Sequence, residues 1–356
     1  MYNRRDILKS LAISPFILGK AFADTAPELV LPKTGLNSIA LDNSKNKITP
    51  RALKAGSKIA ITAPASPSSI GEISTLIKKM KALGVEVEIG ESVRNKDKSM
   101  NYLSRTDEAR AEELMHYFMR QDIDAIFCAR GGYGVMRILD KLDYDIIRQN
   151  PKIIIGYSDI TALLIAIDTK SDLVCYHGPV ASSDLNDFSM KYILAELFEE
   201  YKQLDIEYQN DAMEVIAEGY AVGKLTGGNL TMVISTLGTP YEIDTKDRIL
   251  FLEETREEPY KIDRMFTQLR LSNKLQECKG IILGNFDYLK SKRSFFPGRS
   301  FTTFQVMQNR LGDLNIPVMF GLPFGHMKNK ITLPLGINAK IDTKAKSFSI
   351  IEDTCC

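Results

Sequence analysis

The sequence predicts an α/β protein with an N-terminal domain built on a parallel sheet and a smaller, strand-rich α/β domain on the C-terminal side. Strand-like apolar runs and helical segments alternate over residues 58–176, which is the pattern of βαβ units. A polar break with one amphipathic helix follows over residues 181–209, and the pattern then changes. The 356 residues are enough for two domains that each bury a core.

Residues 1–23 have the pattern of a signal peptide that precedes both domains. Arg4 and Arg5 stand before a short apolar run, which ends in small residues suited to cleavage. The paired arginines resemble the twin-arginine export motif, with an ordinary Sec signal as the alternative, and the apolar run is too short to span a bilayer. We expect a bacterial protein that is periplasmic or otherwise exported, with no stable membrane insertion after signal cleavage.

The first domain is expected over residues 51–185, after a polar segment, 24–50, that predicts a flexible arm. Apolar runs predict strands at 58–62, 85–89, 125–128, 153–155 and 174–176, and periodic segments predict helices at 70–83, 108–120, 135–142 and 160–170. This alternation predicts a parallel sheet of flavodoxin-like type, with helices on both faces. Ligands bind such sheets beyond the carboxyl ends of the strands, so we expect function in the loops that follow them.

A linker with one helix is expected over residues 186–213, the second domain over 214–345 and a tail over 346–356. Apolar runs predict strands at 214–222, 249–252, 280–283, 318–320, 330–333 and 338–342, and periodic segments predict helices at 230–237, 262–271 and 303–311. The density of short strands makes this domain the more strand-rich of the two.

Composition excludes several classes of function. Lys and Arg number 46 and Asp and Glu 45, so the chain lacks the basic surplus of a protein that binds nucleic acid. The five cysteines form no disulfide framework: Cys128 and Cys175 lie in apolar runs typical of buried thiols, and we assign no role to Cys355 and Cys356. The sequence contains neither H-E-x-x-H nor paired C-x-x-C motifs, so we expect catalysis without a metal or cofactor.

Residues 153–161 are the most informative segment of the chain. An apolar strand stops at Gly156, exposes Ser158 and continues as a helix. A strand, a sharp turn and a helix in this order lift a serine hydroxyl above the carboxyl end of a sheet and place the next N–H at a helix N-terminus, where an oxyanion can be held. Ser158 is therefore the candidate nucleophile, although Ile160 stands where the G-x-S-x-G elbow of α/β-hydrolases has its second glycine.

A serine nucleophile needs a base, usually a histidine that a carboxylate orients. Of the three histidines, His116 lies within a helix and is expected to pack or face solvent, and His177 ends a strand, where hydrogen bonding to a loop is favoured over catalysis. His326 lies in a loop rich in Gly and Pro, of the kind that positions function, and is the leading base. The candidates for the carboxylate that orients the histidine are Glu253 and Glu254, at the end of an apolar strand, and we prefer Glu253. The alternative is that both acids cap the next helix or are solvated.

The glycine-rich loop over residues 131–134 matches neither the P-loop nor G-x-G-x-x-G, so it is a weak phosphate signal. Beside a nucleophilic serine, the loop suits an oxyanion hole better, because glycine lets a backbone N–H approach the substrate closely.

With Ser158, Glu253 and His326 in this order, the chain resembles the LD-carboxypeptidase family of serine peptidases, which includes muramoyltetrapeptide carboxypeptidases and microcin-immunity proteins. The resemblance covers roughly residues 58–342. It rests on motifs that are weak alone and specific together: Phe127-Cys128-Ala129-Arg130-Gly131-Gly132-Tyr133-Gly134, Gly156-Tyr157-Ser158-Asp159-Ile160-Thr161, His177-Gly178-Pro179, Gly227-Gly228-Asn229-Leu230, Leu252-Glu253-Glu254 and Gly321-Leu322-Pro323-Phe324-Gly325-His326.

The resemblance implies a Ser-Glu-His triad split across the two domains, with Ser158 in the nucleophile domain and Glu253 and His326 in the other. It implies an oxyanion hole formed by the backbone N–H groups of Asp159 and Gly132. It also makes three residues candidate substrate contacts, Arg130, Gly131 and Asn229.

The reaction that the resemblance implies is removal of the terminal D-alanine from murein tetrapeptides through an acyl-enzyme. The expected partner is a peptidoglycan-derived peptide, and a homodimer is the family default. Such a substrate ends in a free carboxylate, for which Arg130 is the candidate cation by position, with bracing of its own loop as the alternative. Well-known members act in the cytoplasm on recycled fragments, so the export signal puts a recycling role in doubt. A microcin-immunity-like amidase and a non-catalytic periplasmic solute-binding protein are the alternative functions.

Overall fold

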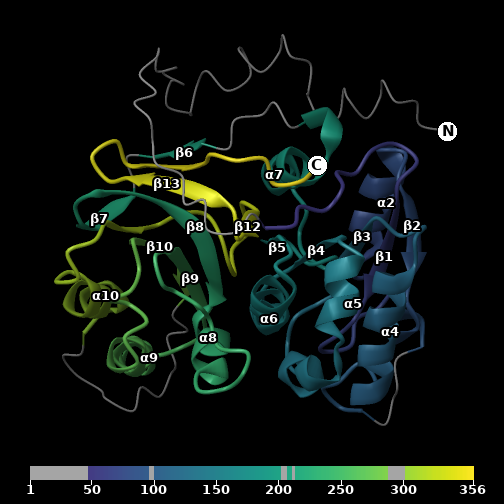
Figure 1. Ribbon diagram of the computed structural model, residues 1–356, viewed down its shortest axis with the longest axis horizontal. Coiled ribbons are helices and arrows are strands. Elements are labelled where there is room, and N and C mark those ends of the chain that lie inside the picture. The colour runs from purple at the N-terminus through teal and green to yellow at the C-terminus, as the bar shows by residue number, and fades with distance from the viewer. Residues whose placement is uncertain (1–46, 96–99, 202–206, 211–212, 288–300) are drawn as a thin grey trace.

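The computed structural model describes residues 47–95, 100–201, 207–210, 213–287 and 301–356. Within these ranges the chain forms a six-stranded and an eight-stranded sheet, which are the centres of two lobes (Figure 1). The predicted signal segment and positions 24–46 of the predicted arm lie outside the described residues. No helix in the described ranges is long and apolar enough to cross a bilayer.

The first sheet has the strand order β12-β5-β4-β3-β1-β2, and β1 to β5 are parallel to one another. The order 2-1-3-4-5 is the flavodoxin-like arrangement, so the predicted fold class of this lobe is confirmed. Its strands from the N-terminal half are β1 (Lys58–Thr62), β2 (Glu86–Ile89), β3 (Ala125–Cys128), β4 (Ile153–Gly156) and β5 (Cys175–His177). The helical elements are α2 (Ser74–Ala82), α3 (Glu91–Arg94), α4 (Asp107–Met119), η1 (Val135–Lys141), α5 (Tyr144–Gln149), η2 (Ser158–Ile160), α6 (Thr161–Ser171), α7 (Asp187–Leu197) and η3 (Glu199–Tyr201).

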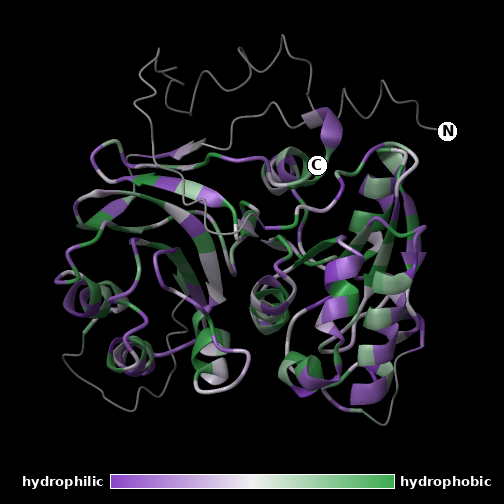
Figure 2. Ribbon diagram, viewed as in Figure 1, coloured by the Kyte–Doolittle hydropathy of each residue, from purple (hydrophilic) through white to green (hydrophobic). Residues whose placement is uncertain are grey.

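Helices cover both faces of the first sheet. Side chains alternate along a strand, so Ile154 of β4 joins the core beneath α4 and α6, whereas Ile153 and Ile155 join the core beneath α2 and α7. A strand that is covered on both faces is apolar at every position, which explains the uninterrupted isoleucine run. Figure 2 shows these hydrophobic strands among helices of mixed colour.

The second sheet has the order β6-β14-β13-β8-β9-β10-β11-β7. Strands β8 to β11 are parallel, and antiparallel strands extend both sides of this central part. The strands are β6 (Glu207–Gln209), β7 (Glu214–Ala217), β8 (Tyr220–Asn229), β9 (Ile249–Thr255), β10 (Gly280–Asp287), β11 (Val318–Phe320), β13 (Asn338–Asp342) and β14 (Ser347–Ile350). The helices of this lobe are α8 (Leu230–Thr236), α9 (Pro259–Leu271) and α10 (Thr303–Leu311).

Two segments near the C-terminus connect the lobes in a way that the sequence pattern did not reveal. Strand β12 (Leu333–Leu335) comes from the C-terminal half but pairs antiparallel with β5 in the first sheet. Residues 346–356, predicted as a tail, contain β14, and the N–H of Cys356 donates a 2.9 Å hydrogen bond to the carbonyl oxygen of Pro50. The C-terminal end of the chain is thus packed against the beginning of the first lobe.

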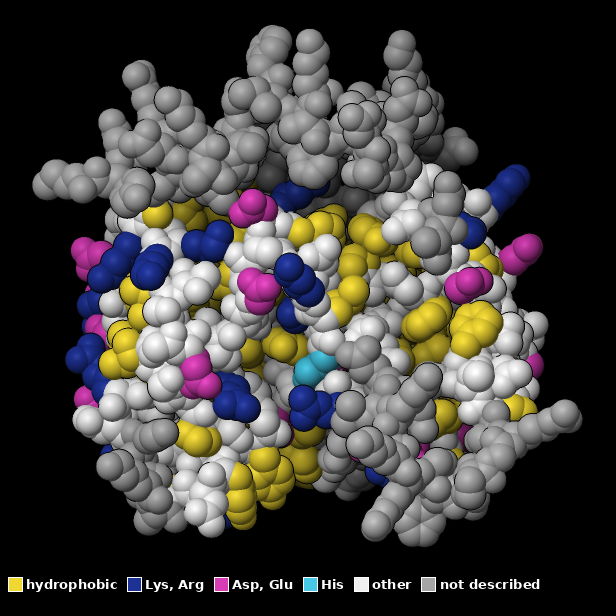
Figure 3. Space-filling view, turned by 180° about the vertical axis from the view of Figure 1, so that it is seen from behind, with side chains coloured by type: hydrophobic (Ala, Val, Ile, Leu, Met, Phe, Trp, Pro, Cys, Tyr) yellow, Lys and Arg dark blue, Asp and Glu magenta, His cyan; other side chains and the backbone are white. Residues whose placement is uncertain are grey.

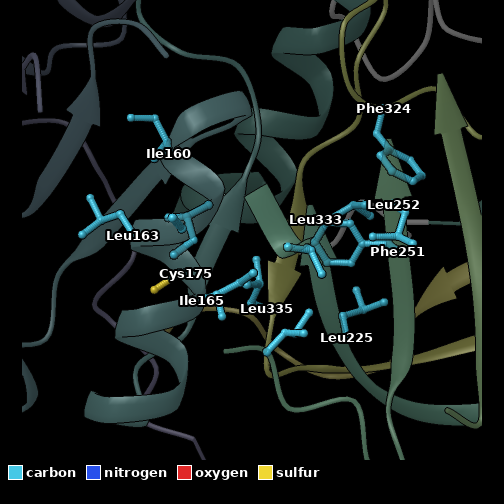
Figure 4. Packing of buried hydrophobic residues seen from close by; sticks show 14 of the residues in the cluster. Ile160, Leu163, Ile165, Cys175, Leu225, Phe251, Leu252, Phe324, Leu333 and Leu335 are labelled. Atoms are coloured by element: carbon cyan, nitrogen blue, oxygen red, sulfur yellow. The ribbon is translucent and has the colours of Figure 1, made fainter. Parts of the chain in front are cut away.

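Helix α6 lies between the two sheets and joins their cores (Figure 1). Every residue from Thr161 to Asp168 is buried, as expected for a helix that is apolar on all sides. Leu163 and Ile165 of α6 belong to the same hydrophobic cluster as Leu225 and Phe251 of the second sheet (Figure 4). Because α6 begins just after Ser158, the candidate nucleophile lies at the junction of the lobes.

Candidate active site

Ser158 follows β4 and is the first residue of η2, which leads directly into α6. Its φ is +66°, in the left-handed region that costs a non-glycine residue about 1–2 kcal/mol. This is the sharp strand-to-helix turn that the sequence predicts, and backbone strain of this kind clusters at active sites. Gly131 lies against the turn, because a Cβ atom at Gly131 would come within 2.8 Å of the Cβ atom of Ser158.

Glu253 and His326 form a hydrogen-bonded pair in the second lobe. The Glu253 side chain, on β9, is fully buried, whereas the His326 side chain, in the loop after β11, is 23% exposed. The Nδ1 atom of His326 lies 2.7 Å from Oε2 of Glu253. A carboxylate at Nδ1 favours the tautomer with its proton on that nitrogen, which leaves Nε2 available as a base.

Asn229 connects the two acids at the end of β9. Its Nδ2 donates to Oε1 of Glu253 at 3.1 Å and to Oε1 of Glu254 at 3.2 Å, and its Oδ1 caps α8 by accepting from the N–H of Met232. Oε2 of Glu254 instead accepts from the N–H and hydroxyl of Thr231, and burial raises the pKa of Glu254. The two acids therefore differ in role: Glu253 faces His326, and Glu254 stabilises the start of α8. Asn229, a candidate substrate contact, is 5% exposed and uses its amide within the protein.

Tyr157 brings the serine turn next to His326. The rings of Tyr157 and His326 meet edge to face with centroids 4.9 Å apart. Among the described residues no hydrogen bond joins Ser158 to His326, and catalytic hydrogen bonds of this kind often tighten only when substrate is bound. Figure 3 shows a histidine on the surface near the centre of the molecule, with Lys or Arg side chains above and below it.

The two predicted oxyanion-hole residues lie in segments that are fixed beside Ser158. Oδ2 of Asp159 accepts a 2.9 Å hydrogen bond from the N–H of Val135, which ties the serine turn to the end of the glycine-rich loop, and burial raises the pKa of Asp159. Gly132 has φ +108°, which favours glycine, and a Cβ atom there would collide with the side chain of Ser66. The Ser66 hydroxyl in turn accepts from the N–H of Tyr133 at 3.1 Å.

Arg130 lies at the beginning of this loop, with its side chain half exposed. Its Nη1 atom is 3.7 Å from Oε1 of Glu72, whose other oxygen, Oε2, accepts a hydrogen bond from the N–H of Ser69 at 2.7 Å. Of the two roles considered for Arg130, this ion pair favours bracing of the loop.

Two further residues close to the pair were not assigned a site role from the sequence. His177, at the end of β5, is 1% exposed and packs against the rings of Tyr157, Phe251 and Phe324. Burial lowers the pKa of His177 to about 4, and neither ring nitrogen has a hydrogen-bond partner among the described residues. The expected loop hydrogen bond is therefore wrong, because aromatic rings surround the imidazole. Lys330 places its Nζ atom 5.6 Å from the centre of the Tyr157 ring, and no sequence motif singles out this lysine.

Comparison with known proteins identifies the family. Residues 59–178 match the LD-carboxypeptidase N-terminal domain, and residues 222–341 match the LD-carboxypeptidase C-terminal domain. The chain belongs to the LD-carboxypeptidase family. Ser158 lies in the first matched segment, and Glu253 and His326 lie in the second.

Three relatives illustrate this membership. The probable murein peptide carboxypeptidase of Bacillus subtilis is 36% identical over 306 residues, which cover 85% of this chain and 93% of the relative. The crystal structure of muramoyltetrapeptide carboxypeptidase from Oxalobacter formigenes has a TM-score of 0.72 and 30% identity, covering 83% of this chain and 99% of that one. The microcin C7 self-immunity protein MccF of Escherichia coli is 32% identical over 285 residues, covering 70% of this chain and 80% of MccF. Membership of this family supports a peptidase activity. The relatives include murein-related and immunity-related proteins.

Proposed function

We propose that this LD-carboxypeptidase family member removes the terminal D-alanine from murein tetrapeptides through a covalent acyl-enzyme on Ser158. The observation that carries the proposal is the 2.7 Å contact between His326 Nδ1 and the buried Glu253 carboxylate, beside the turn that presents Ser158. A histidine held in this way is suited to proton transfer at Nε2, which a serine alcohol needs before it can attack a carbonyl.

In the proposed reaction, Ser158 Oγ attacks the carbonyl carbon that precedes D-alanine while His326 Nε2 takes the hydroxyl proton. The N–H groups of Asp159 and Gly132 would stabilise the oxyanion. His326 then returns the proton to the departing amine, so that D-alanine leaves and an ester remains on Ser158. Water hydrolyses this ester by the same proton transfers and restores the serine.

Glu253 would contribute by its charge and its fixed position. Its carboxylate is fully buried, so its interaction with an imidazolium is less screened by water than a surface ion pair. The Asn229 amide holds the other carboxylate oxygen at 3.1 Å, which restricts rotation of the acid. Asn229 is thus a positioning residue for the dyad in this proposal.

The test is incubation of the purified protein with a murein tetrapeptide, followed by mass spectrometry for loss of one alanine. Ser158→Ala should abolish the acyl-enzyme, and Glu253→Gln should lower kcat about 1,000- to 10,000-fold, as expected when the carboxylate that orients a catalytic histidine is neutralised. Glu254→Gln is the matched control, because it neutralises the neighbouring acid, which hydrogen-bonds Thr231 instead of His326. Equal effects of the two Glu→Gln variants would contradict the triad.

The similarity to MccF supports a second candidate, hydrolysis of a peptide-nucleotide amide by the same triad. A panel that contains murein tri-, tetra- and pentapeptides and a peptide-nucleotide amide distinguishes the two, because the highest kcat/KM identifies the substrate class. Tight binding of a peptide without turnover would instead favour a solute-binding protein.

We further propose that the protein acts outside the cytoplasm, on the sacculus or on fragments released there. The support is the twin-arginine-like sequence at its N-terminus, which lies outside the described residues. Cell fractionation with N-terminal sequencing of the mature chain tests this. A cytoplasmic protein with an intact N-terminus would refute it.

A further inference from the structure

The proposed substrate carries a charge that the triad does not neutralise. A peptide that is cut at its last bond ends in a free carboxylate close to the reacting carbonyl, and a site specific for such ends needs a cation there. Arg130 is the candidate that the sequence offers, but its side chain is 51% exposed and already faces Glu72. A cation that is less exposed to solvent and has no carboxylate partner would discriminate more strongly between charged and neutral peptide ends.

Lys330 meets both conditions. The residue is 7% exposed, and no hydrogen bond or ion pair of its ammonium group is found among the described residues. Burial lowers the pKa of Lys330, and the negative charges of Asp184 and Glu253 raise it, yet neither acid is within ion-pair distance. A buried cation without a counter-ion is unfavourable, so a bound anion would compensate it.

The position of Lys330 relates it to the reacting atoms. Its Nζ atom lies 5.6 Å from the centre of the Tyr157 ring, and the same ring contacts His326 with centroids 4.9 Å apart. Tyr157 directly precedes Ser158 in the chain. The ammonium group and the imidazole therefore lie beside the same aromatic ring, which belongs to the residue that precedes the nucleophile.

The backbone around Lys330 is fixed. Its N–H donates a 3.0 Å hydrogen bond to the Ser189 hydroxyl of α7, and Asn186, which caps α7, donates to Oδ1 of Asn329 at 2.8 Å. Strand β12 begins three residues later and is paired with β5. These bonds fix the main chain from which the lysine side chain extends, and a site built in advance in this way lowers the cost of binding.

We propose that Lys330 binds the free terminal carboxylate of the substrate and thereby makes the enzyme a carboxypeptidase. This inference rests on the proposed function. The ligand class is a peptide C-terminus. The same peptide with a neutral terminus would lose the charge interaction and keep every other contact.

The experiment compares a murein tetrapeptide that ends in D-alanine with the same peptide ending in D-alanine amide. The wild-type enzyme should favour the acid by about 10- to 100-fold in kcat/KM, the range for a hydrogen bond between charged groups. Lys330→Met should reduce this preference to near one, mainly by raising KM for the acid, and Lys330→Arg should retain part of it. Lys328→Met is the matched control, because Lys328 is exposed in the same loop and should leave the preference unchanged.

Several outcomes would overturn the assignment. If Lys330→Met keeps the acid preference, or slows both peptides equally, Lys330 does not bind the terminal carboxylate. If Arg130→Met removes the preference and Lys330→Met does not, Arg130 is the anchor. Thermal unfolding of Lys330→Met should give an unchanged or higher Tm, because a buried unpaired charge is removed, and a large fall with an intact acid preference would make the lysine structural.

The acid and amide should also be compared for binding to the Ser158→Ala variant by calorimetry, with and without Lys330→Met. This measurement separates the two proposals. If the wild-type enzyme neither binds nor cleaves the tetrapeptide, the proposed function fails and the role of Lys330 falls with it. If cleavage occurs and the acid binds no better than the amide, only the role of Lys330 fails.

Discussion

The close approach of Gly131 to Ser158 gives a sensitive test of the candidate nucleophile. A Cβ atom at Gly131 would lie 2.8 Å from Ser158 Cβ, 3.1 Å from Oγ and 3.2 Å from the carbonyl oxygen of Tyr157. The first distance is about 0.6 Å short of ordinary van der Waals contact, and two of the three atoms belong to the nucleophile itself. Gly131→Ala should therefore displace the serine by adding one methyl group and no polar or charged atom.

We expect Gly131→Ala to lower kcat about 10- to 100-fold, because a misplacement of about 1 Å costs a rate of this size. The free energy of unfolding should fall by only about 1–3 kcal/mol, the usual cost of overpacking, so the protein stays folded. Steady-state kinetics on the tetrapeptide and chemical denaturation measure the two quantities on the same preparation.

Gly71→Ala is the control, because the nearest atom to its added Cβ is the Ser69 hydroxyl at 3.9 Å, an ordinary contact. It should leave both quantities close to those of the wild type. A Gly131→Ala enzyme with kcat within twofold of the wild type would refute the reasoning, since Ser158 could then not depend on the space at Gly131.

Three other variants test the surroundings of the site. Asn229→Ala should lower the free energy of unfolding by about 1–3 kcal/mol in chemical denaturation and reduce kcat, because Glu253 and Glu254 lose a shared donor. A variant with unchanged stability and unchanged kcat would contradict the positioning role. His177 in the folded state binds a proton only near pH 4, whereas the unfolded chain does so near pH 6.5, so wild-type stability should decrease by up to about 3 kcal/mol as the pH falls through this window. His177→Phe should lack that part of the pH dependence in denaturation curves recorded from pH 7 to 4. If the stabilities of the wild type and the variant change in parallel with pH, His177 is not the source of the loss. Asp168→Asn should lower the free energy of unfolding by about 3 kcal/mol and reduce kcat. The reason is that buried Asp168 of α6 pairs with Arg248 at 3.2 Å and with Lys47 at 3.0 Å. An unchanged kcat would show that this pairing does not control the site.

The first sheet was predictable because its physical causes are local. The run Ile153–Ile155 is apolar at each position, as in a strand that is covered on both faces, and the alternation of such runs with helices favours parallel pairing. The segment 135–142 was also predicted as helical, but it forms the tighter 3-10 helix η1. Periodicity over eight residues does not distinguish the two types of helix.

The candidate site was predictable to the extent that its residues follow strands or lie in glycine-rich loops. Ser158 and His326 follow this rule, whereas Glu253 lies within β9, near its carboxyl end. The Glu253–His326 contact joins two segments that the sequence could only place at a strand end and in a loop. Lys330 and the burial of His177 were not predictable, because both depend on which side chains from other elements surround them. Nothing within the sequence near Arg130 indicates that Glu72 faces it.

The pairing of β12 with β5 explains how two lobes can hold one site in register. His326 and β12 belong to one continuous segment, and Leu333 of β12 is paired with His177 of β5. Strand β5 in turn pairs with β4, where Gly156 is opposite His177, and Ser158 follows two residues later. A ladder of backbone hydrogen bonds thus connects the histidine segment to the serine turn. The segment that carries the base is therefore attached by β12 to the sheet that carries the nucleophile, while Glu253 of the second lobe holds the imidazole itself.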